Sequence, residues 1–225
     1  MIEPAVTGPT RWGRRIIGPF TLRHIVVVVT VVIVAASSLA LLSAPIADPI
    51  AASPPVPGSG FYRLGEPTTG LTVGQLAPEL EGEQAGEPVA LLDLDGELVR
   101  LEDRRGGPVW LSFFATWCPP CQEETPVLRE AHERYSVVGL EMIAVSVQET
   151  TVDDVAAYAA TYDLPYTIGF DATSAVFRAY GGFGLPTHVF LDDEGVIQRL
   201  HYGPLDRDQV AAIVEPLLDP SVQRG

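Results

Sequence analysis

The stretch that decides the fold is residues 113–121, Phe-Phe-Ala-Thr-Trp-Cys-Pro-Pro-Cys, which holds both cysteines of the 225-residue chain. Residues 109–115 (VWLSFFA) are apolar and aromatic, which predicts a short buried strand. Beyond the cysteines, Leu128, Ala131 and Tyr135 recur at helical spacing and predict a helix over 119–135, with Pro126 expected to kink it. The cysteines therefore lie where a buried strand turns into a helix.

This position suits a reversible dithiol. At the helix N-terminus, Cys118 would meet free backbone N–H groups and the positive end of the helix dipole, which stabilise a thiolate. Cys121, about one turn further along, is close enough to attack a mixed disulfide on Cys118. Pro119 and Pro120 lack N–H groups, which costs little at a helix start, and they hold the turn between the two sulfurs.

Other uses of two cysteines remain open at this point. A structural disulfide across so short a loop would stabilise the fold weakly, because it removes little chain entropy. A zinc site needs four ligands, and His132, His188 and His201 show no ligand spacing, so no metal site is expected. A peroxide-reducing thiol would not explain a second cysteine at this spacing. No cofactor beyond the cysteine pair is expected.

The charge distribution suggests a membrane segment near the N-terminus. Arg11, Arg14, Arg15 and Arg23 precede residues 25–47, an uncharged run of about 23 residues that is long enough to span a bilayer. The basic flank predicts that residues 1–24 are a short cytoplasmic N-terminus and that the C-terminal domain lies outside. A cleaved signal peptide is the alternative, although its apolar core is usually about 7 to 15 residues. The net charge of −15 argues against a nucleic-acid partner.

The rest of the chain divides into a tether and one domain. Residues 48–69 are rich in Pro, Gly, Ser and Ala, which is typical of a linker, and residues 70–220 have the patterning of a globular domain. We expect a hairpin around Asp95-Gly96 and another around 193–195. The remaining expected elements are strands at 140–147 and 167–170 and helices at 151–162, 171–180 and 206–218. This order predicts an α/β fold with a central mixed sheet flanked by helices on both faces.

Several motifs carry a family resemblance. The sequence W-C-P-P-C (117–121), the C-x-x-E-x-P continuation to Pro126, the segments 73–78 and 91–102, and G-L-P-T (184–187) resemble the TlpA-like membrane-anchored thiol-disulfide oxidoreductases. These belong to the thioredoxin superfamily and include reductases that serve cytochrome c maturation. The resemblance covers about 73–218 and implies a thioredoxin-like fold with an N-terminal β-hairpin and a central strand–helix insertion at 140–170.

The resemblance also implies roles for individual residues. Pro186 matches the cis-proline, and Leu185 before it would offer its backbone to an extended substrate segment; a trans turn proline is the alternative. Trp117 would shape the docking surface unless it is a plain core aromatic. Pro119 and Thr187 complete the expected substrate-contacting set.

Glu124 matches the family's acidic residue and would exchange a proton with Cys121, unless it is an ordinary solvated carboxylate. Ser112 is a departure, because thioredoxin has a buried acid at this position and the family often has an amide.

The preferred hypothesis is a protein-disulfide reductase on the outer face of the cytoplasmic membrane. A membrane electron donor would recharge it, and its substrates would be disulfides of exported proteins, with apocytochrome c as a candidate. Disulfide chemistry is active in that compartment. A disulfide-forming oxidase would use the same residues in reverse. A non-catalytic binding or metallochaperone module is the third reading, although copper-handling relatives typically place three residues between their cysteines and add a histidine.

Overall fold

The computed structural model describes residues 22–42, 60–66 and 70–219. It divides into two units, residues 1–51 and 52–225, which are considered separately. The first unit contains α1 (Leu22–Leu42). The predicted span 25–47 overlaps α1, while 43–47, most of 1–24 and most of 48–69 lie outside the described residues. Within the described ranges, no helix has the combined length and apolar character needed to cross a membrane.

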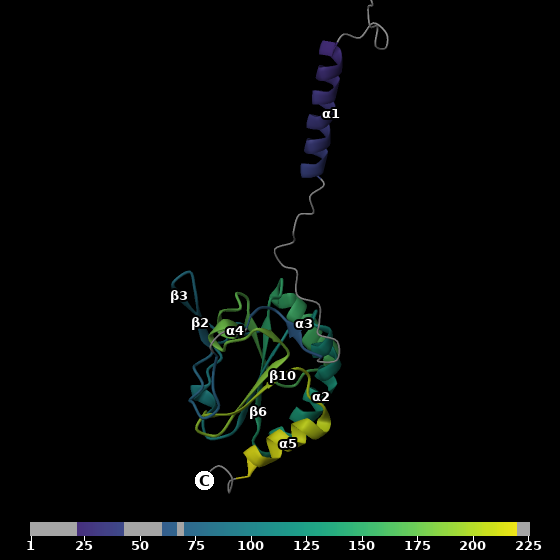
Figure 1. The fold of residues 1–225 in the computed structure, drawn as a ribbon. Helices are drawn as coiled ribbons and strands as arrows, with labels where there is room; N and C mark the ends of the chain where they lie inside the picture. Colours follow the sequence, from purple (N-terminus) through teal and green to yellow (C-terminus); the bar gives the residue numbers. More distant parts are fainter. Residues whose placement is uncertain (1–21, 43–59, 67–69, 220–225) are drawn as a thin grey trace, which may run out of the picture. The chain divides into compact units, whose positions relative to one another are not determined.

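The second unit is built on a six-stranded mixed sheet (Figure 1). Its strand order is β10-β9-β5-β6-β7-β4, in which β5, β6 and β7 are parallel and the other pairs are antiparallel. The strands are β4 (Leu92–Asp93), β5 (Val109–Phe114), β6 (Glu141–Val147), β7 (Thr167–Asp171), β9 (Thr187–Leu191) and β10 (Ile197–Tyr202). β5, β6 and β9 are almost wholly buried, which explains why their sequences are apolar runs rather than alternating patterns.

Helices cover both faces of this sheet. They are α2 (Pro119–Tyr135), α3 (Val152–Tyr162), α4 (Ala175–Ala179) and α5 (Arg207–Leu218), with short 3₁₀ turns at Glu102–Arg104 and Ser136–Val138. Right-handed crossovers from β5 to β6 and from β6 to β7 place α2 and α3 on one face. α5 joins α2 there, since Val214 packs with Leu128 and Trp110. α4 covers the other face, where Phe177 stacks on Phe113 at 5.3 Å.

The capping residues set the helix ends as the sequence predicts. Thr151 accepts the N–H of Asp154 at the start of α3, and Asp206 and Gln209 form a reciprocal capping box at the start of α5. The predicted helix at 171–180 is shorter in the structure, because the Asp171 carboxylate accepts the N–H groups of Ala175 and Phe177 and the helix begins only there. α2 has the predicted bounds and continues through Pro126.

The N-terminal part of the domain differs from the sequence-based prediction. The turn at Asp95-Gly96 is present, but its second arm makes only a bridge from Leu98 to Leu92. An unpredicted hairpin forms from β2 (Glu81–Gln84) and β3 (Glu87–Ala90), and it projects from the domain in Figure 1. Its charged, exposed sequence lacks strand alternation. It is held instead by close packing on α4, where a Cβ at Gly82 would lie 2.3 Å from the Ala175 backbone.

A further short strand lies within the region that the sequence assigns to the tether. β1 (Tyr62–Arg63) pairs antiparallel with β8 (Gly184–Leu185), with Tyr62 opposite Leu185 and Arg63 opposite Gly184. β8 immediately precedes Pro186 and β9. The chain before residue 70 therefore reaches the end of the domain that carries the G-L-P-T motif.

Candidate active site

The two cysteines form a disulfide at the first turn of α2, with their Cα atoms 5.3 Å apart. Cys118 is the extended N-cap residue, and Pro119 and Pro120 follow at the first helical positions. The side chains of both cysteines are buried, Cys118 fully and Cys121 to 97%. Because Cys118 stands at the N-terminus of α2, the helix dipole would favour its thiolate after reduction. The arrangement can therefore act as a two-electron dithiol–disulfide couple.

The loop in front of the cysteines is fixed by the loop after β6. Trp117 donates its indole N–H to the carbonyl oxygen of Gln148 at 3.0 Å. The Glu149 carboxylate accepts the Thr116 hydroxyl at 2.9 Å and also the Thr116 backbone N–H. β5 and β6 are parallel, so these loops leave the same edge of the sheet. Trp117 is 39% exposed and is therefore not the plain core aromatic that the sequence allowed.

The G-L-P-T segment lies at the same end of the sheet. The Leu185–Pro186 peptide bond is cis, as the resemblance implies. Thr187 pairs with Phe113, and its hydroxyl donates to the Gly184 carbonyl at 2.7 Å. Leu185 and Thr187 are buried. The backbone of β8, which the resemblance assigns to substrate pairing, is occupied here by β1.

Glu124 belongs to a buried polar cluster on the α2 face. It is 3% exposed, so the solvated-carboxylate alternative is wrong. Its Oε1 accepts the N–H of Leu205 at 2.8 Å and lies 3.1 Å from Nε2 of His188, although these last two atoms are not aligned for a hydrogen bond. Nδ1 of His188 accepts the indole N–H of Trp110 at 3.2 Å. An indole can only donate, so Nδ1 acts as the acceptor in this contact.

His188 was not assigned to the site from the sequence. Ser112 stands opposite His188 in the β5–β9 register and is buried, and within the described residues its Oγ has no hydrogen-bond partner. The available signal was a histidine in the otherwise apolar strand THVFL, where a fully buried imidazole needs polar partners. The positions of those partners depend on the pairing of β9 with β5 and on the packing of α2.

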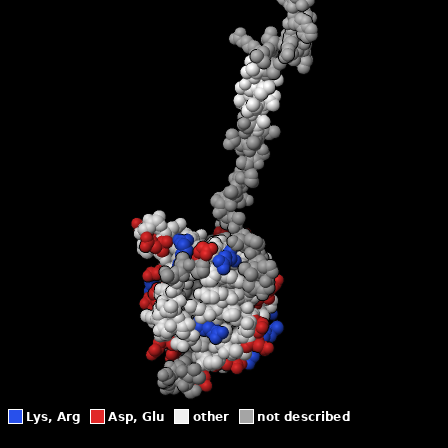
Figure 2. Space-filling view, in the orientation of Figure 1, with Lys and Arg blue, Asp and Glu red and all other residues white. Residues whose placement is uncertain are grey.

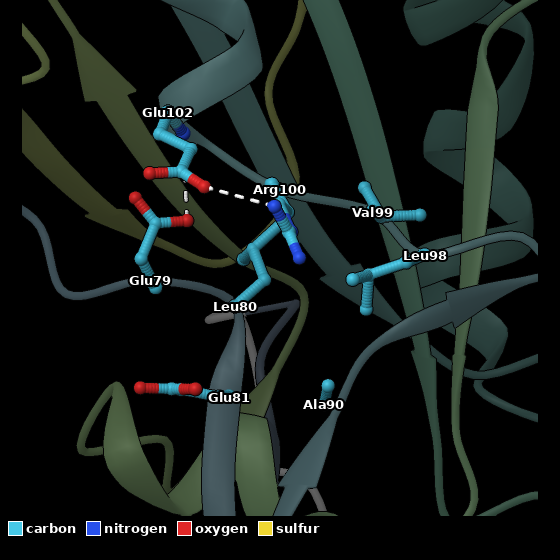
Figure 3. Close-up of a pocket in the computed structure, with 8 residues that line it drawn as sticks. All are labelled: Glu79, Leu80, Glu81, Ala90, Leu98, Val99, Arg100 and Glu102. Atoms are coloured by element: carbon cyan, nitrogen blue, oxygen red, sulfur yellow. Dashed lines mark hydrogen bonds and ion pairs between the residues drawn. The ribbon is translucent and has the colours of Figure 1, made fainter.

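A pocket of about 320 Å³ lies between the β2–β3 hairpin and residues 98–102 (Figure 3). The Glu79 carboxylate there accepts the backbone N–H of Leu101 at 2.9 Å, and Arg100 contacts Glu102 at 3.2 Å. None of the predicted site residues lines this pocket. In the described part of the chain, no group of three or more His, Cys, Asp or Glu is arranged to hold a metal ion.

The AhpC/TSA family matches residues 73–200, more than half of the chain. The chain belongs to the AhpC/TSA family. Among curated proteins, the thiol-disulfide oxidoreductase ResA of Geobacillus thermodenitrificans is 32% identical over 149 residues, covering 66% of this chain and 80% of that protein. ResA of Halalkalibacterium halodurans is 35% identical over 134 residues, covering 60% and 75%.

Solved structures with a similar fold include other thiol-disulfide exchange proteins. The crystal structure of a putative thiol:disulfide interchange protein DsbE from Chlorobium tepidum has a TM-score of 0.57 and 28% identity, covering 66% of this chain and 99% of that one. The fold is thioredoxin-like. With these relatives and a disulfide at the N-terminus of α2, the protein is an oxidoreductase whose redox couple is Cys118–Cys121.

One prediction concerns His201, which pairs with His188 in the β9–β10 register at 6.0 Å between rings. Burial, and secondarily the nearby His188, lower the pKa of His201 below its ordinary value. A hydrogen bond to the Pro204 carbonyl raises this pKa, but by less than burial lowers it. Below about pH 6.5 the unfolded chain then takes up a proton that the folded state resists, so stability falls as pH falls through this range. In His201→Gln, the free energy of unfolding, measured by urea titration, should therefore decrease less between pH 7 and pH 5 than in the unmodified protein. An equal decrease in both proteins would contradict this prediction.

Proposed function

We propose that the protein is a protein-disulfide reductase that works on the outer face of the cytoplasmic membrane. The observation that carries this proposal is the Cys118–Cys121 couple at the N-terminus of α2, at the same end of the sheet as the cis Leu185–Pro186 bend. The first feature supplies an exchangeable dithiol, and the second supplies a backbone edge for an extended protein segment. The names of the ResA relatives support the same reaction class.

The reaction proceeds by two thiol–disulfide exchanges. The Cys118 thiolate attacks one sulfur of a substrate disulfide, forms a mixed disulfide and releases the other substrate sulfur as a thiolate. The Cys121 thiol loses its proton and attacks Cys118, which restores the Cys118–Cys121 disulfide and releases the second substrate sulfur. Two electrons pass to the substrate, and two protons complete its thiols. A membrane electron donor then reduces the disulfide again.

Glu124 is positioned to take the proton from Cys121. The two residues are three apart in α2, which places their side chains on one face of the helix. Its Oε1 accepts the Leu205 N–H at 2.8 Å and lies 3.1 Å from Nε2 of His188. A carboxylate on the same helix face as a thiol is a residue type that serves as a general base.

The sequence supports the proposed substrates and location. The uncharged run 25–47 and the arginines before it support a single-pass anchor with the C-terminal domain outside. Exported proteins with disulfides are then the accessible substrates, and apocytochrome c is the candidate that the resemblance to TlpA-like reductases suggests. On the face shown in Figure 2, most of the surface is uncharged and the acidic side chains gather toward its edge, so we expect docking there to depend on backbone and apolar contacts.

The reduction potential of the Cys118–Cys121 pair tests the direction of the reaction. Equilibration in thiol buffers, followed by alkylation of free thiols, should give a value near or below about −230 mV. A value near about −120 mV would instead indicate a disulfide-forming oxidase. The Cys118→Ser variant is the control and should show no couple. If the unmodified protein also lacks a reversible couple, a non-catalytic binding module remains.

The role of Glu124 is tested by Glu124→Gln, whose amide oxygen can still accept the Leu205 N–H. We expect the release of substrate from the mixed disulfide to slow by about 100-fold at neutral pH, because general base catalysis is lost. The loss should shrink at alkaline pH, where Cys121 ionises without help. Single-turnover release measured against pH gives this profile, with exposed Glu123→Gln as the matched control. Equal slowing at every pH would assign Glu124 a structural role instead.

The anchor is tested by cell fractionation of the full chain. The protein should stay with membranes after an alkaline wash, and protease added from outside should digest the domain. Deletion of residues 25–47 should release the protein from the membrane. A soluble protein whose N-terminus begins after residue 44 would contradict the anchor and support a cleaved signal peptide.

A further inference from the structure

The backbone edge that would receive a substrate is covered by the chain's own N-terminal segment. We call residues 61–65 the strap. Tyr62 and Arg63 pair with Leu185 and Gly184 in an antiparallel register, directly before the cis Pro186. The N–H groups of Leu64 and Gly65 both donate to the Phe183 carbonyl, at 2.7 and 3.0 Å. A segment from outside the chain would have to make its backbone contacts at this same edge.

The strap is also held by aromatic contacts that reach the redox site. The Tyr62 ring meets Trp117 edge-on at 5.4 Å, immediately before Cys118. Phe61 packs against Phe183 at 5.3 Å and Tyr202 at 6.1 Å. The strap therefore occupies both the backbone edge of β8 and the aromatic surface beside it.

Gly184 shows how closely the strap fits. A Cβ at this position would lie 2.2 Å from the Phe61 ring and 2.8 Å from the Tyr62 carbonyl oxygen. Gly184 has no positive φ, so its small size, rather than its backbone conformation, is what this contact uses. The surface is therefore shaped for an extended backbone with an aromatic side chain lying directly over β8.

The strap is also in contact with the surroundings of the redox couple. Cys118 has no exposed surface, and Tyr62 and Leu64 pack on the apolar cluster that contains it. Attack on a protein disulfide requires the Cys118 sulfur to reach a substrate sulfur beside a docked segment. The strap and such a segment exclude each other, because both need the same hydrogen-bonding edge of β8.

We propose that residues 61–65 are a built-in competitor for the substrate site, and that the surface they cover binds an extended peptide with an aromatic residue against Trp117. This inference rests on the proposed function, since it concerns how a substrate reaches Cys118. The partner segment must displace the strap before exchange. Segments that reproduce its aromatic contacts displace it most readily, so the strap acts as a filter on substrates.

The test uses the full chain carrying Cys121→Ser, which stops the reaction at the mixed disulfide. The substrate is a synthetic peptide with the sequence of residues 60–66 plus one cysteine, activated as a disulfide with 2-nitro-5-thiobenzoate. Attack by Cys118 joins the peptide to the protein and releases the coloured thiolate. The symmetrical small disulfide of the same thiol, which has no peptide backbone, reports the intrinsic reactivity of Cys118.

Tyr62→Ala/Leu64→Pro removes the ring contact with Trp117 and one N–H bond to Phe183, and leaves β8 intact. We expect the ratio of the peptide rate to the small-disulfide rate to rise about tenfold. This is the change expected if the strap leaves the β8 edge free in only about a tenth of the molecules of the unmodified protein. Val73→Ala, at a 60% exposed position outside the strap, should leave the ratio unchanged. An unchanged or lower ratio in the strap variant would overturn the proposal.

Hydrogen exchange separates failure of the strap from failure of the proposed function. In the protein with an intact strap, the amides of Leu64 and Gly65 should lose protection when the peptide is bound, and keep it with the small thiol. If neither disulfide reacts, the proposed function fails. Displacement of the strap can then still be tested by adding an excess of the same peptide with serine in place of cysteine, which binds without a covalent bond. Retained protection under the bound peptide would show that the strap is a fixed part of the fold.

Discussion

The antiparallel pairing of β9 with β5 is the constraint on which the site depends. β5 ends in the loop that carries the cysteines, and β9 begins at the cis proline bend, so their pairing sets Thr187 beside Phe113 at one end of the sheet. The same register places His188 opposite Ser112 and Phe190 opposite Trp110. A shift of one residue would turn His188 to the opposite face and remove it from Glu124. Redox couple, docking edge and buried cluster are thus fixed by one strand pair.

The buried polar cluster has a cost in folding free energy. Glu124 and His188 are almost fully enclosed, and desolvating a carboxylate is costly unless it is hydrogen-bonded or paired. The bonds from Leu205 to Glu124 and from Trp110 to His188 offset part of that cost. Ser112 adds a second buried polar group on the same face. The burial of these polar groups is consistent with the proton-transfer role proposed for Glu124.

The elements that the sequence predicted well are those set by local chemistry. The bounds of α2 follow from Cys-Pro-Pro at its start and an apolar stripe along it, and the caps at Thr151 and Asp206 act within one turn. The β2–β3 hairpin was missed because its exposed, charged residues give no alternation, and its support is close contact between Gly82 and α4. The helix after Asp171 was predicted too long because its carboxylate bonds to N–H groups four and six residues on.

The sequence by itself determined the redox couple and its surroundings along the chain. The cysteine spacing, the prolines between them, the strand before and the helix after all depend on residues within a few positions of one another. Only the tertiary structure decided that Glu124 is buried against His188, that Trp117 is exposed, and that Tyr62 pairs with Leu185. Burial and strand register arise from contacts between segments far apart in the chain, and residues 62 and 185 come together only when the whole domain has folded.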